Sequence, residues 1–403
     1  MRVNNFYEKV IKVLSEAQRL RSTKVFTVVK SDPTLRSKTD LSRGCLSFVM
    51  EIQCKVPENS YLFIGSGAIN VPVGDLMKLL SSVRQIAQAV NYLIRTCPTI
   101  DEACLQRVKV GNVPISQLLS ELRVVQTPVD YGGRIVIPGS SLKGAVRNRL
   151  ELAFKPIHQE CRDVVYSCFI RQSTGTIDLQ RGWRYIYING PEVAVSRSST
   201  CDITRGEAAV CKVCDLLGTA GLASRVDFND ALPVSDFEPV EMTLEHGEHI
   251  LAIPPGTVFK TEISFRNVSP EEAGLIFMAL NLHCEKETPI LIGRFKYRKK
   301  HWKEKKTNVI FGRLTFLKDT AVIKVPRFIM ACNVPKELEF IKKGKLTNSQ
   351  IVLTGREAQE FINHCIEKTR EKFGKILHEF FLKCSYEEIF RRLEEVSERE
   401  YHV

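Results

Sequence analysis

The chain has 403 residues, more than one compact core of ordinary size holds, so its length predicts two lobes or one core with large insertions. Its 58 Lys and Arg against 46 Asp and Glu give a formal net charge of +12, which favours a polyanionic partner such as a nucleic acid. The hydrophobic content of 44% is ample for folding, yet no apolar run approaches the ~20 residues of a membrane span, which excludes a membrane protein.

The chain contains thirteen cysteines, an odd number without the regular paired spacing of a disulfide framework. No cleavable signal sequence precedes them. Together these features predict a cytoplasmic protein.

Residues 1–44 are predicted to form an N-terminal helical arm. Phe6, Val10, Val13 and Leu14 recur at helical spacing and would form one buried stripe. The residues that follow are rich in turn formers and read as a linker.

The core is predicted to span residues 45–330 and to begin with two strands. Apolar residues alternate over 46–56, which is typical of a half-buried strand. A second short strand over 61–64 ends in a glycine loop, Gly65-Ser66-Gly67.

Residues 68–133 form an insertion between this loop and the next motif, with two stretches of helical periodicity. Asp75 stands immediately before one of them, in GDLMKLL, so its sequence favours a helix N-cap. Asp130 lies in VDYGG and reads as a turn residue.

The sequence RIVIPGSSLKGAVRNRLELA, residues 134–153, predicts a short strand, a tight turn and an amphipathic helix. Ser140 or Ser141 would cap the helix by accepting a hydrogen bond from its first N–H groups. Lys143, Arg147 and Arg149 lie opposite the apolar face.

A glycine turn that leads into a helix N-terminus offers N–H donors and a favourable dipole to an anion, and Lys143 adds positive charge there. A phosphate would fit at this position. The alternative, an ordinary connection with solvated basic residues, stays open at this point.

Cys211 and Cys214 form a CxxC pair, which presents two thiolates to one tetrahedral ion. Zinc needs two more ligands; Cys201 lies ten residues earlier, and His158, Cys161 and Cys168 lie further upstream. The sequence therefore leaves two alternatives, a structural zinc site or a reduced, partly buried pair.

Downstream, alternation over 258–268 predicts a strand, and Pro270 followed by two glutamates predicts the start of a largely buried helix. Residues 291–314 then combine many basic residues with Phe295, Tyr297 and Trp302. Exposed aromatic rings beside Arg and Lys are what a stacking surface for single-stranded nucleic acid requires, whereas a solvated charged hairpin is the alternative.

Residues 331–403 are predicted to form a helical C-terminal extension. The stretches that begin at Glu357 and at Tyr386 have helical spacing and many i,i+4 charge pairs. They would pack on the core or on a neighbouring subunit.

The segment IPGSSLKGAVRNRL, residues 137–150, resembles a helix of the RAMP proteins, which form the backbone of type III CRISPR effector complexes of the Csm and Cmr kind. CKVCDLLG at 211–218 and GLASRVDFNDA at 221–231 resemble two further segments of that family, in the same order. The resemblance implies an α+β fold with a ferredoxin-like (RNA-recognition-motif-like) core, in which the insertion 68–133 corresponds to a thumb.

The resemblance also implies partners: CRISPR guide RNA, target RNA, and other RAMP-family and large subunits of a type III effector complex. Phe63 stands where the family usually has a histidine, and bulky basic residues replace the glycines of its glycine-rich loop near 293–300. The candidate RNA-binding residues are Gly65, Ser66, Gly67, Ser140, Ser141, Lys143, Arg147, Arg294, Lys296, Arg298, Lys299, Lys300 and Trp302. The candidate ligands of a structural zinc are Cys201, Cys211 and Cys214.

Two functions follow from the sequence. The first is a guide RNA-binding structural subunit without a catalytic role of its own, acting in antiviral defence. The second is a metal-assisted endoribonuclease of the same superfamily that cuts target or precursor RNA, for which Asp75 is the catalytic candidate because the family's nuclease aspartate lies in this interval. The scattered histidines argue against a self-contained active site.

Overall fold

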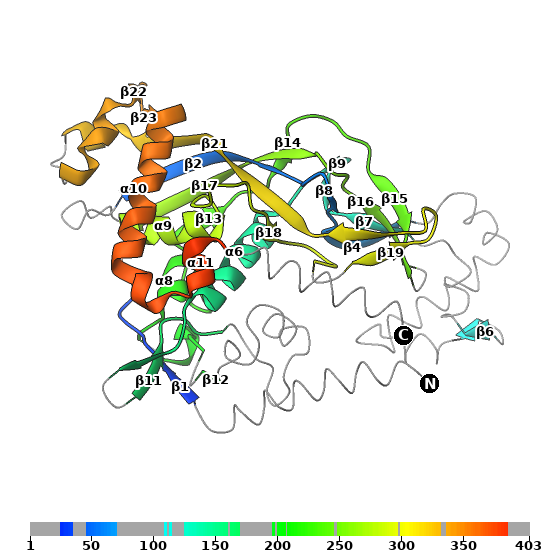
Figure 1. The fold of residues 1–403 in the computed structure, drawn as a ribbon, viewed down its shortest axis with the longest axis horizontal. Coiled ribbons are helices and arrows are strands. Elements are labelled where there is room, and N and C mark those ends of the chain that lie inside the picture. The colour runs from blue at the N-terminus through cyan, green and yellow to red at the C-terminus, as the bar shows by residue number, and fades with distance from the viewer. Residues whose placement is uncertain are drawn as a thin grey trace.

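The computed structural model describes residues 25–34, 46–70, 109–110, 113–114, 125–159, 162–169, 196–197, 200–206, 208–245, 248–296, 299–331 and 336–385. Within these ranges the protein combines several sheets with a few helices, an α+β architecture (Figure 1). None of the described helices has both the length and the apolar character that a membrane span requires.

The largest sheet is antiparallel and has the strand order β13-β17-β2-β21-β23-β22. Buried and half-buried residues alternate along β2, so that one face of the sheet is covered and the other is open. Its strands are β2 (Leu46–Lys55), β13 (Val226–Phe228), β17 (Val258–Val268), β21 (Arg313–Pro326), β22 (Lys345–Leu346) and β23 (Gln350–Leu353), with β14 (Leu232–Pro233) and β18 (Ile290–Leu291) paired at the side.

Three helices cover one face of this sheet (Figure 1): α6 (Gly139–Ala153), α9 (Pro270–Ala279) and α10 (Gly355–Phe373). Phe48 on β2 stacks on Phe265 of β17 with ring centroids 4.3 Å apart and meets Phe361 of α10 edge-on at 5.1 Å. Phe277 of α9 completes this aromatic cluster. The apolar stripes of the helices therefore meet the covered face of the sheet in one continuous core.

The central strands β2, β13, β17 and β21 and the helices α6 and α9 follow one another along the chain in the order β2, α6, β13, β17, α9, β21, with smaller elements between them. This order is β-α-β-β-α-β. Ser269 and Glu272 form a capping box at the start of α9, and Pro270 occupies its first turn. The predicted strands at 46–56 and 258–268 and the predicted helix from Pro270 are therefore confirmed.

Smaller sheets surround the core. One has the order β15-β16-β7-β4, one β19-β20-β3 and one β10-β11-β1-β12, and two hairpins are separate. Their strands are β1 (Val25–Val28), β3 (Ser60–Tyr61), β4 (Gly65–Asn70), β5 (Lys109–Val110), β6 (Val113–Pro114), β7 (Val125–Pro128), β8 (Asp130–Tyr131), β9 (Arg134–Ile135), β10 (Ile157–Gln159), β11 (Arg162–Val165), β12 (Ser196–Arg197), β15 (Val240–Thr243), β16 (His249–Ala252), β19 (Lys300–Trp302) and β20 (Thr307–Phe311).

The remaining helices are short. They are η4 (Ile203–Arg205), α8 (Lys212–Leu217), η6 (Arg327–Ala331), η7 (Lys336–Lys343), η8 (Gly374–Ile376) and α11 (Glu379–Lys383). After residue 331 the structure confirms a long helix, α10, but it also contains two strands, β22 and β23, that the sequence did not predict.

Several predicted features lie outside the described residues. They are the N-terminal helix, the helical runs of the insertion together with Asp75, the residues Cys161, Tyr297 and Arg298, and the last helix from Tyr386.

Helices α9 and α10 are in close contact at Gly274. A Cβ atom there would clash with the carbonyl oxygen of Cys365 and the hydroxyl of Thr369. We therefore expect Gly274→Ala to lower the free energy of unfolding by roughly 1–3 kcal/mol, measured by urea denaturation, because the helices would have to separate. Gly374→Ala is the control, since Gly374 is helical with no atom within 4 Å of an added Cβ. Equal stability of both variants would contradict this close packing.

Candidate nucleic-acid interface and cysteine cluster

The helix α6 begins where the chain crosses strand β13. A Cβ atom at Gly139 would clash with the backbone of Phe228, so only glycine fits there. The N-cap is Pro138, and the N–H of Gly139 donates to Oδ1 of Asp230 at 2.7 Å. The predicted cap by Ser140 or Ser141 is therefore wrong, because both serines already lie inside the first turn and a carboxylate from another segment binds the helix N-terminus.

The motifs that the sequence singled out lie on neighbouring backbone segments. Arg294 N–H donates to Phe63 O at 2.9 Å, Val129 N–H donates to Ile64 O at 3.0 Å, and Ile137 and Ala231 exchange two hydrogen bonds. We call the resulting row of residues 63–67, 129–141, 229–231 and 292–294 the motif strip. It unites the GSG, IPGSS, NDA and IGR sequences, which are far apart in the chain.

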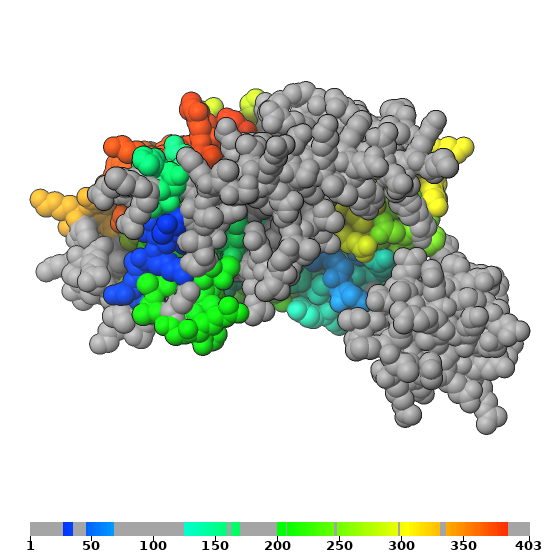
Figure 2. Space-filling model, turned by 90° about the horizontal axis from the view of Figure 1, so that it is seen from below, coloured from blue at the N-terminus to red at the C-terminus, as the bar shows by residue number. Residues whose placement is uncertain are grey.

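Part of the motif strip is exposed. Gly65, Ser66, Gly67 and Ser140 are exposed and Ser141 is half-buried, and β4 and the residues near 125–135 lie together on the face seen in Figure 2. The predicted glycine loop is thus the first part of β4.

The hairpin β8–β9 adds an aromatic residue that sequence reasoning missed. Its turn is Gly132-Gly133, both with positive φ. The prediction of Asp130 as a turn residue is wrong, because Asp130 lies in strand β8 and the two glycines make the turn. Tyr131 is 59% exposed and lies beside Asp230, whose charge and hydrogen bond raise the pKa of Tyr131. Only the hairpin geometry shows that this ring faces outward, so the sequence held no local signal for it.

The basic residues of α6 bond within the protein. Lys143 forms an ion pair with Asp227 at 3.4 Å and remains partly exposed. Arg149 donates to the carbonyl oxygen of Ala279 at 2.7 Å. The side chain of Arg147 is only 11% exposed and binds Gly218 O, Glu151 and the sulfur of Cys214. The alternative of a solvated basic residue does not hold for Arg147, because this face packs on α8. The RNA contact predicted for Arg147 stays a prediction, and its side chain already binds groups of the protein.

The basic segment after residue 291 also differs from its prediction. Trp302 is 5% exposed and packs edge-on against Tyr61 in a second apolar core with Phe63, Met242 and Phe311. It therefore offers no exposed face to a base, and the predicted exposure of this ring is wrong. The physical reason is the hairpin β15–β16, whose apolar side covers the tryptophan.

The same hairpin neutralises the charges of this segment. The side chain of Lys300 is 3% exposed and pairs with Glu245 at 3.5 Å and Glu248 at 3.2 Å. Arg294 is half-exposed and pairs with Glu248 at 2.9 Å. Lys296 and Lys299 are half-buried. Among the candidate RNA-binding Lys and Arg residues in the described part of the chain, Arg294 is the most exposed, and it belongs to the motif strip.

Four buried cysteines meet behind α6. Cys168 follows β11, Cys201 precedes η4, and Cys211 and Cys214 begin α8, and their sulfur atoms all lie within 4.8 Å of one another. The structure therefore joins the three predicted ligands with Cys168. The sequence had placed Cys168 only among several upstream candidates, because it lies 43 residues before Cys211.

The geometry of this cluster fits a tetrahedral zinc ion. Zinc–sulfur bonds of about 2.3 Å place the sulfur atoms of a tetrahedron about 3.8 Å apart. The Cys168–Cys214 and Cys168–Cys211 sulfur distances are 3.5 and 3.7 Å. Backbone N–H groups of Cys168 and Cys211 donate to neighbouring sulfurs at 3.3 and 3.1 Å, as is common around metal-bound thiolates.

The electrostatics of the cluster separate its members. Hydrogen bonds from the other thiols, first that of Cys168, and the charge of Arg147 lower the pKa of Cys214. The hydrogen bonds of Cys168 with its three neighbours raise its own pKa. Hydrogen bonds, first that of Cys168, also lower the pKa of Cys211. Thiolates are thus favoured at the CxxC pair, whereas four thiolates together require a cation.

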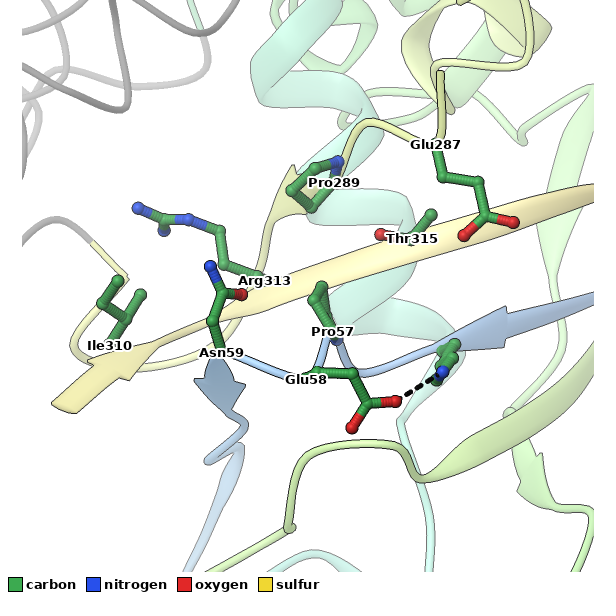
Figure 3. A pocket seen from close by; sticks show the side chains of 9 residues that line it. Pro57, Glu58, Asn59, Glu287, Pro289, Ile310, Arg313 and Thr315 are labelled. Carbon is green, nitrogen blue, oxygen red and sulfur yellow. Dashed lines mark ion pairs between the residues drawn. The ribbon is translucent and has the colours of Figure 1, made fainter. Parts of the chain in front are cut away.

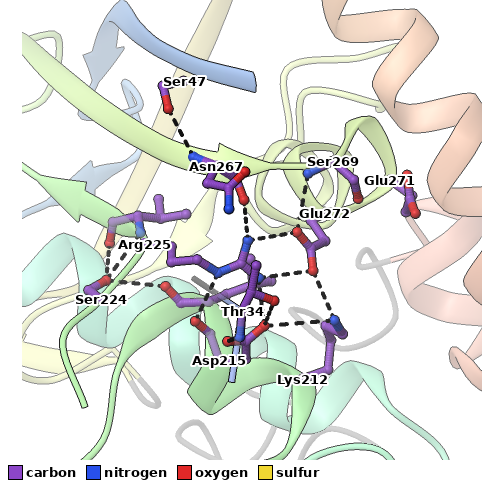
Figure 4. A network of polar contacts seen from close by, with 12 residues as sticks. Thr34, Ser47, Lys212, Asp215, Ser224, Arg225, Asn267, Ser269, Glu271 and Glu272 are labelled. Carbon is purple, nitrogen blue, oxygen red and sulfur yellow. Dashed lines mark hydrogen bonds and ion pairs between the residues drawn. The ribbon is translucent and has the colours of Figure 1, made fainter. Parts of the chain in front are cut away.

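A buried ion network holds α8 against the core (Figure 4). Arg225 is fully buried and donates to Asp215 of α8 at 2.6 Å and to Glu272 of α9 at 2.8 and 2.9 Å. Lys212 also binds Glu272, and Thr34 binds Asp215. The network connects the CxxC helix to α9 and to the segment after β1.

A shallow pocket of about 360 Å³ is lined by the end of β2, the turn after it, the segment before β18, and residues of β20 and β21 (Figure 3). Glu58 pairs with Lys55 at 2.6 Å at its edge, and Glu287 and Arg313 add one charge of each sign. This balance of charges gives it no preference for an anion, in contrast to the motif strip.

Comparisons with known proteins complete the description of the site. No curated protein matches the sequence. Among solved structures, the crystal structure of T. onnurineus Csm5 is similar at 16% identity, covering 58% of this chain and 74% of that chain, with a TM-score of 0.25, too low to support an argument. The family model of the RAMP superfamily matches residues 59–387, which include the motif strip and the cysteine cluster. Because this match spans most of the chain, the protein belongs to the RAMP superfamily.

Proposed function

We propose that the protein is a guide (CRISPR) RNA-binding structural subunit of a type III CRISPR-Cas interference complex, acting in antiviral defence in the cytoplasm. Its partners would be guide RNA, target RNA, and other RAMP-family and large subunits. The motif strip carries this proposal, because it brings the family's separate sequence motifs together in one row of residues, part of which is exposed. The net charge of +12 supports a polyanionic partner.

We also propose that the central sheet and its first two helices form a ferredoxin-like core. The element order β-α-β-β-α-β and the strand order β13-β17-β2-β21 are the support for this assignment. In such a core the motif strip runs past the end of the sheet where α6 begins.

The chemistry of the motif strip suits an RNA backbone. Glycines at 65 and 67 lack side chains, so a phosphate can approach the main-chain N–H groups closely. Arg294 supplies a guanidinium group that can bind a phosphate, and Tyr131 supplies an exposed ring on which a base can stack. Lys143 would exchange its ion pair with Asp227 for a phosphate at low cost because both groups are partly exposed.

We further propose that Cys168, Cys201, Cys211 and Cys214 hold a structural zinc ion, which would supply no reaction chemistry. The ion would join the loop after β11, the segment before η4 and the helix α8 at one point. Because α6 packs on α8, the cluster would also fix the helix that begins in the motif strip. The alternative, a metal-assisted endoribonuclease, still rests on Asp75 and its position in the sequence.

The RNA proposal predicts a weaker affinity for the double variant Tyr131→Ala Arg294→Ala. One lost stacking contact and one lost phosphate contact would raise Kd for synthetic guide RNA by about tenfold or more and would reduce the log-log salt slope by about one unit, measured by fluorescence anisotropy. Arg356→Ala is the matched control, because Arg356 is also an exposed arginine paired with a glutamate but lies on α10.

Equal affinity and slope in the double variant and in the control would remove the motif strip from the RNA site. Arg147→Glu is unsuitable for this test, since it would place a carboxylate beside the cysteine cluster. Purification of the native complex, with its RNA sequenced and its subunits counted, tests the assignment to a type III complex independently.

A further inference from the structure

A second cysteine site lies near the end of the described chain. Cys284 follows α9 and Cys384 ends α11, and a disulfide joins them across 100 residues of sequence. Their Cα atoms are 5.7 Å apart, a common separation for bonded cysteines. Both residues are partly exposed, so a small thiol reagent can reach them.

His283 lies beside this pair. One of its ring nitrogens and the two sulfur atoms lie within 4.8 Å of one another. Its Nε2–H donates to the carbonyl oxygen of Phe381 at 2.8 Å, which leaves Nδ1 as a buried acceptor with no hydrogen-bond partner among the described residues. Burial lowers the pKa of His283 to about 4, so its ring is neutral near pH 7.

The pair joins the last described segment to the loop after α9, and backbone hydrogen bonds place that segment against the end of α6. Before α11, His378 N–H donates to Ala153 O at 2.8 Å, and Lys155 N–H donates to Ile376 O at 3.0 Å. Phe381 of α11 is buried in the core. A bond between Cys284 and Cys384 therefore holds α11 in place where it meets the end of the helix that begins in the motif strip.

We propose that Cys284 and Cys384 form a reversible redox site that reacts with low-molecular-weight disulfides such as glutathione disulfide. In the reduced protein, one thiol gives up its proton to the solvent, and the thiolate attacks a sulfur of glutathione disulfide and releases one glutathione. The second cysteine thiolate then attacks the protein sulfur of the mixed disulfide and releases the second glutathione. Two protein thiols thus lose two electrons and two protons, and glutathione disulfide becomes two molecules of glutathione.

The chain supplies internal controls for this site. Cys54 and Cys365 are fully buried, and burial raises the pKa of both thiols. Both are free cysteines outside any disulfide. They should remain thiols under conditions that oxidise Cys284 and Cys384.

The test is a redox titration of the purified full-length protein in glutathione buffers of stepwise composition. After acid quenching and alkylation, mass spectrometry should show Cys284 and Cys384 passing together from alkylated thiols to one linked peptide pair, reversibly, while Cys54 and Cys365 stay alkylated. Trypsin cleavage after Lys383 should be about tenfold slower in the oxidised form, because α11 must detach before it is cut.

Two variants sharpen the result. Cys384→Ser should leave Cys284 as a mixed disulfide with glutathione and should abolish the change in trypsin cleavage. His283→Gln should leave the equilibrium ratio of the two forms unchanged, because the ring of His283 is neutral near pH 7. Independent alkylation of the two cysteines at every buffer composition, or a disulfide that glutathione never reduces, would overturn the proposal.

Discussion

Replacing Cys214 with serine is expected to release the zinc ion from the purified protein and to lower the free energy of unfolding by several kcal/mol. Wild-type protein should contain one zinc per chain by elemental analysis, and the variant should contain almost none. The melting temperature should fall by more than for any other single substitution proposed for this chain.

The size of this effect follows from the position of the cluster. Zinc binding by small thiolate sites contributes about 10–16 kcal/mol, whereas a whole domain is stable by roughly 5–15 kcal/mol. Here the four sulfur atoms come from three separate segments, so loss of the ion releases α8 and the loops before it at once. The charge of Arg147, which lies 3.7 Å from the Cys214 sulfur, would also lose its thiolate partner.

Cys365→Ser is the matched control, because Cys365 is equally buried but lies outside the cluster. It should cost about 1–3 kcal/mol, the price of a buried hydroxyl, and leave the zinc content unchanged. Metal-free wild-type protein of full stability would show instead that the cluster is four reduced thiols.

The elements that the sequence predicted are those with local signals. Alternation of apolar residues is enough for β2 and β17, because each strand has one covered face. Pro270 and Glu272 mark the start of α9 through the capping box. Strand β23 escaped prediction because its four residues are too short for a period and owe their place to pairing with β21.

The site was harder to predict because its geometry depends on distant segments. The residues next to Trp302 in the sequence do not indicate that Met242 and Leu244 pack around its ring. The helical period of α6 predicts that Arg147 lies opposite the apolar face, which is where the structure has it. The side chain is nevertheless mostly buried, because it packs beside the cysteine cluster. Asp230 likewise caps α6 from 91 residues away. Motif resemblance identified these segments, whereas their contacts required the fold.

The second large effect is expected at Arg225. Arg225→Met should lower the free energy of unfolding by roughly 3–5 kcal/mol in urea denaturation, because the buried carboxylates of Asp215 and Glu272 lose the buried guanidinium group between them and keep only the partly exposed Lys212. Lys324→Met is the control, because it breaks a partly exposed ion pair with Glu51. Lys260 also pairs with Glu51, so the variant should lower the free energy of unfolding by about 1 kcal/mol or less.

The pH dependence distinguishes a lost ion network from a simple packing defect. Burial raises the pKa of Glu272, but hydrogen bonds from Arg225 and the charges of Lys212 and Arg225 outweigh it and lower the pKa from 4.5 to about 2. The stability that Glu272 contributes is therefore present above pH 4.5 and is lost as the pH falls toward 2. In Arg225→Met this acid-side loss should shrink, so the stability difference from wild type should narrow below pH 4.5. A packing defect alone would give a constant stability difference across this pH range. The triple variant Arg225→Met Asp215→Asn Glu272→Gln also removes the two carboxylate charges, so it should recover part of the lost stability. If the defect were packing alone, the triple variant would recover none.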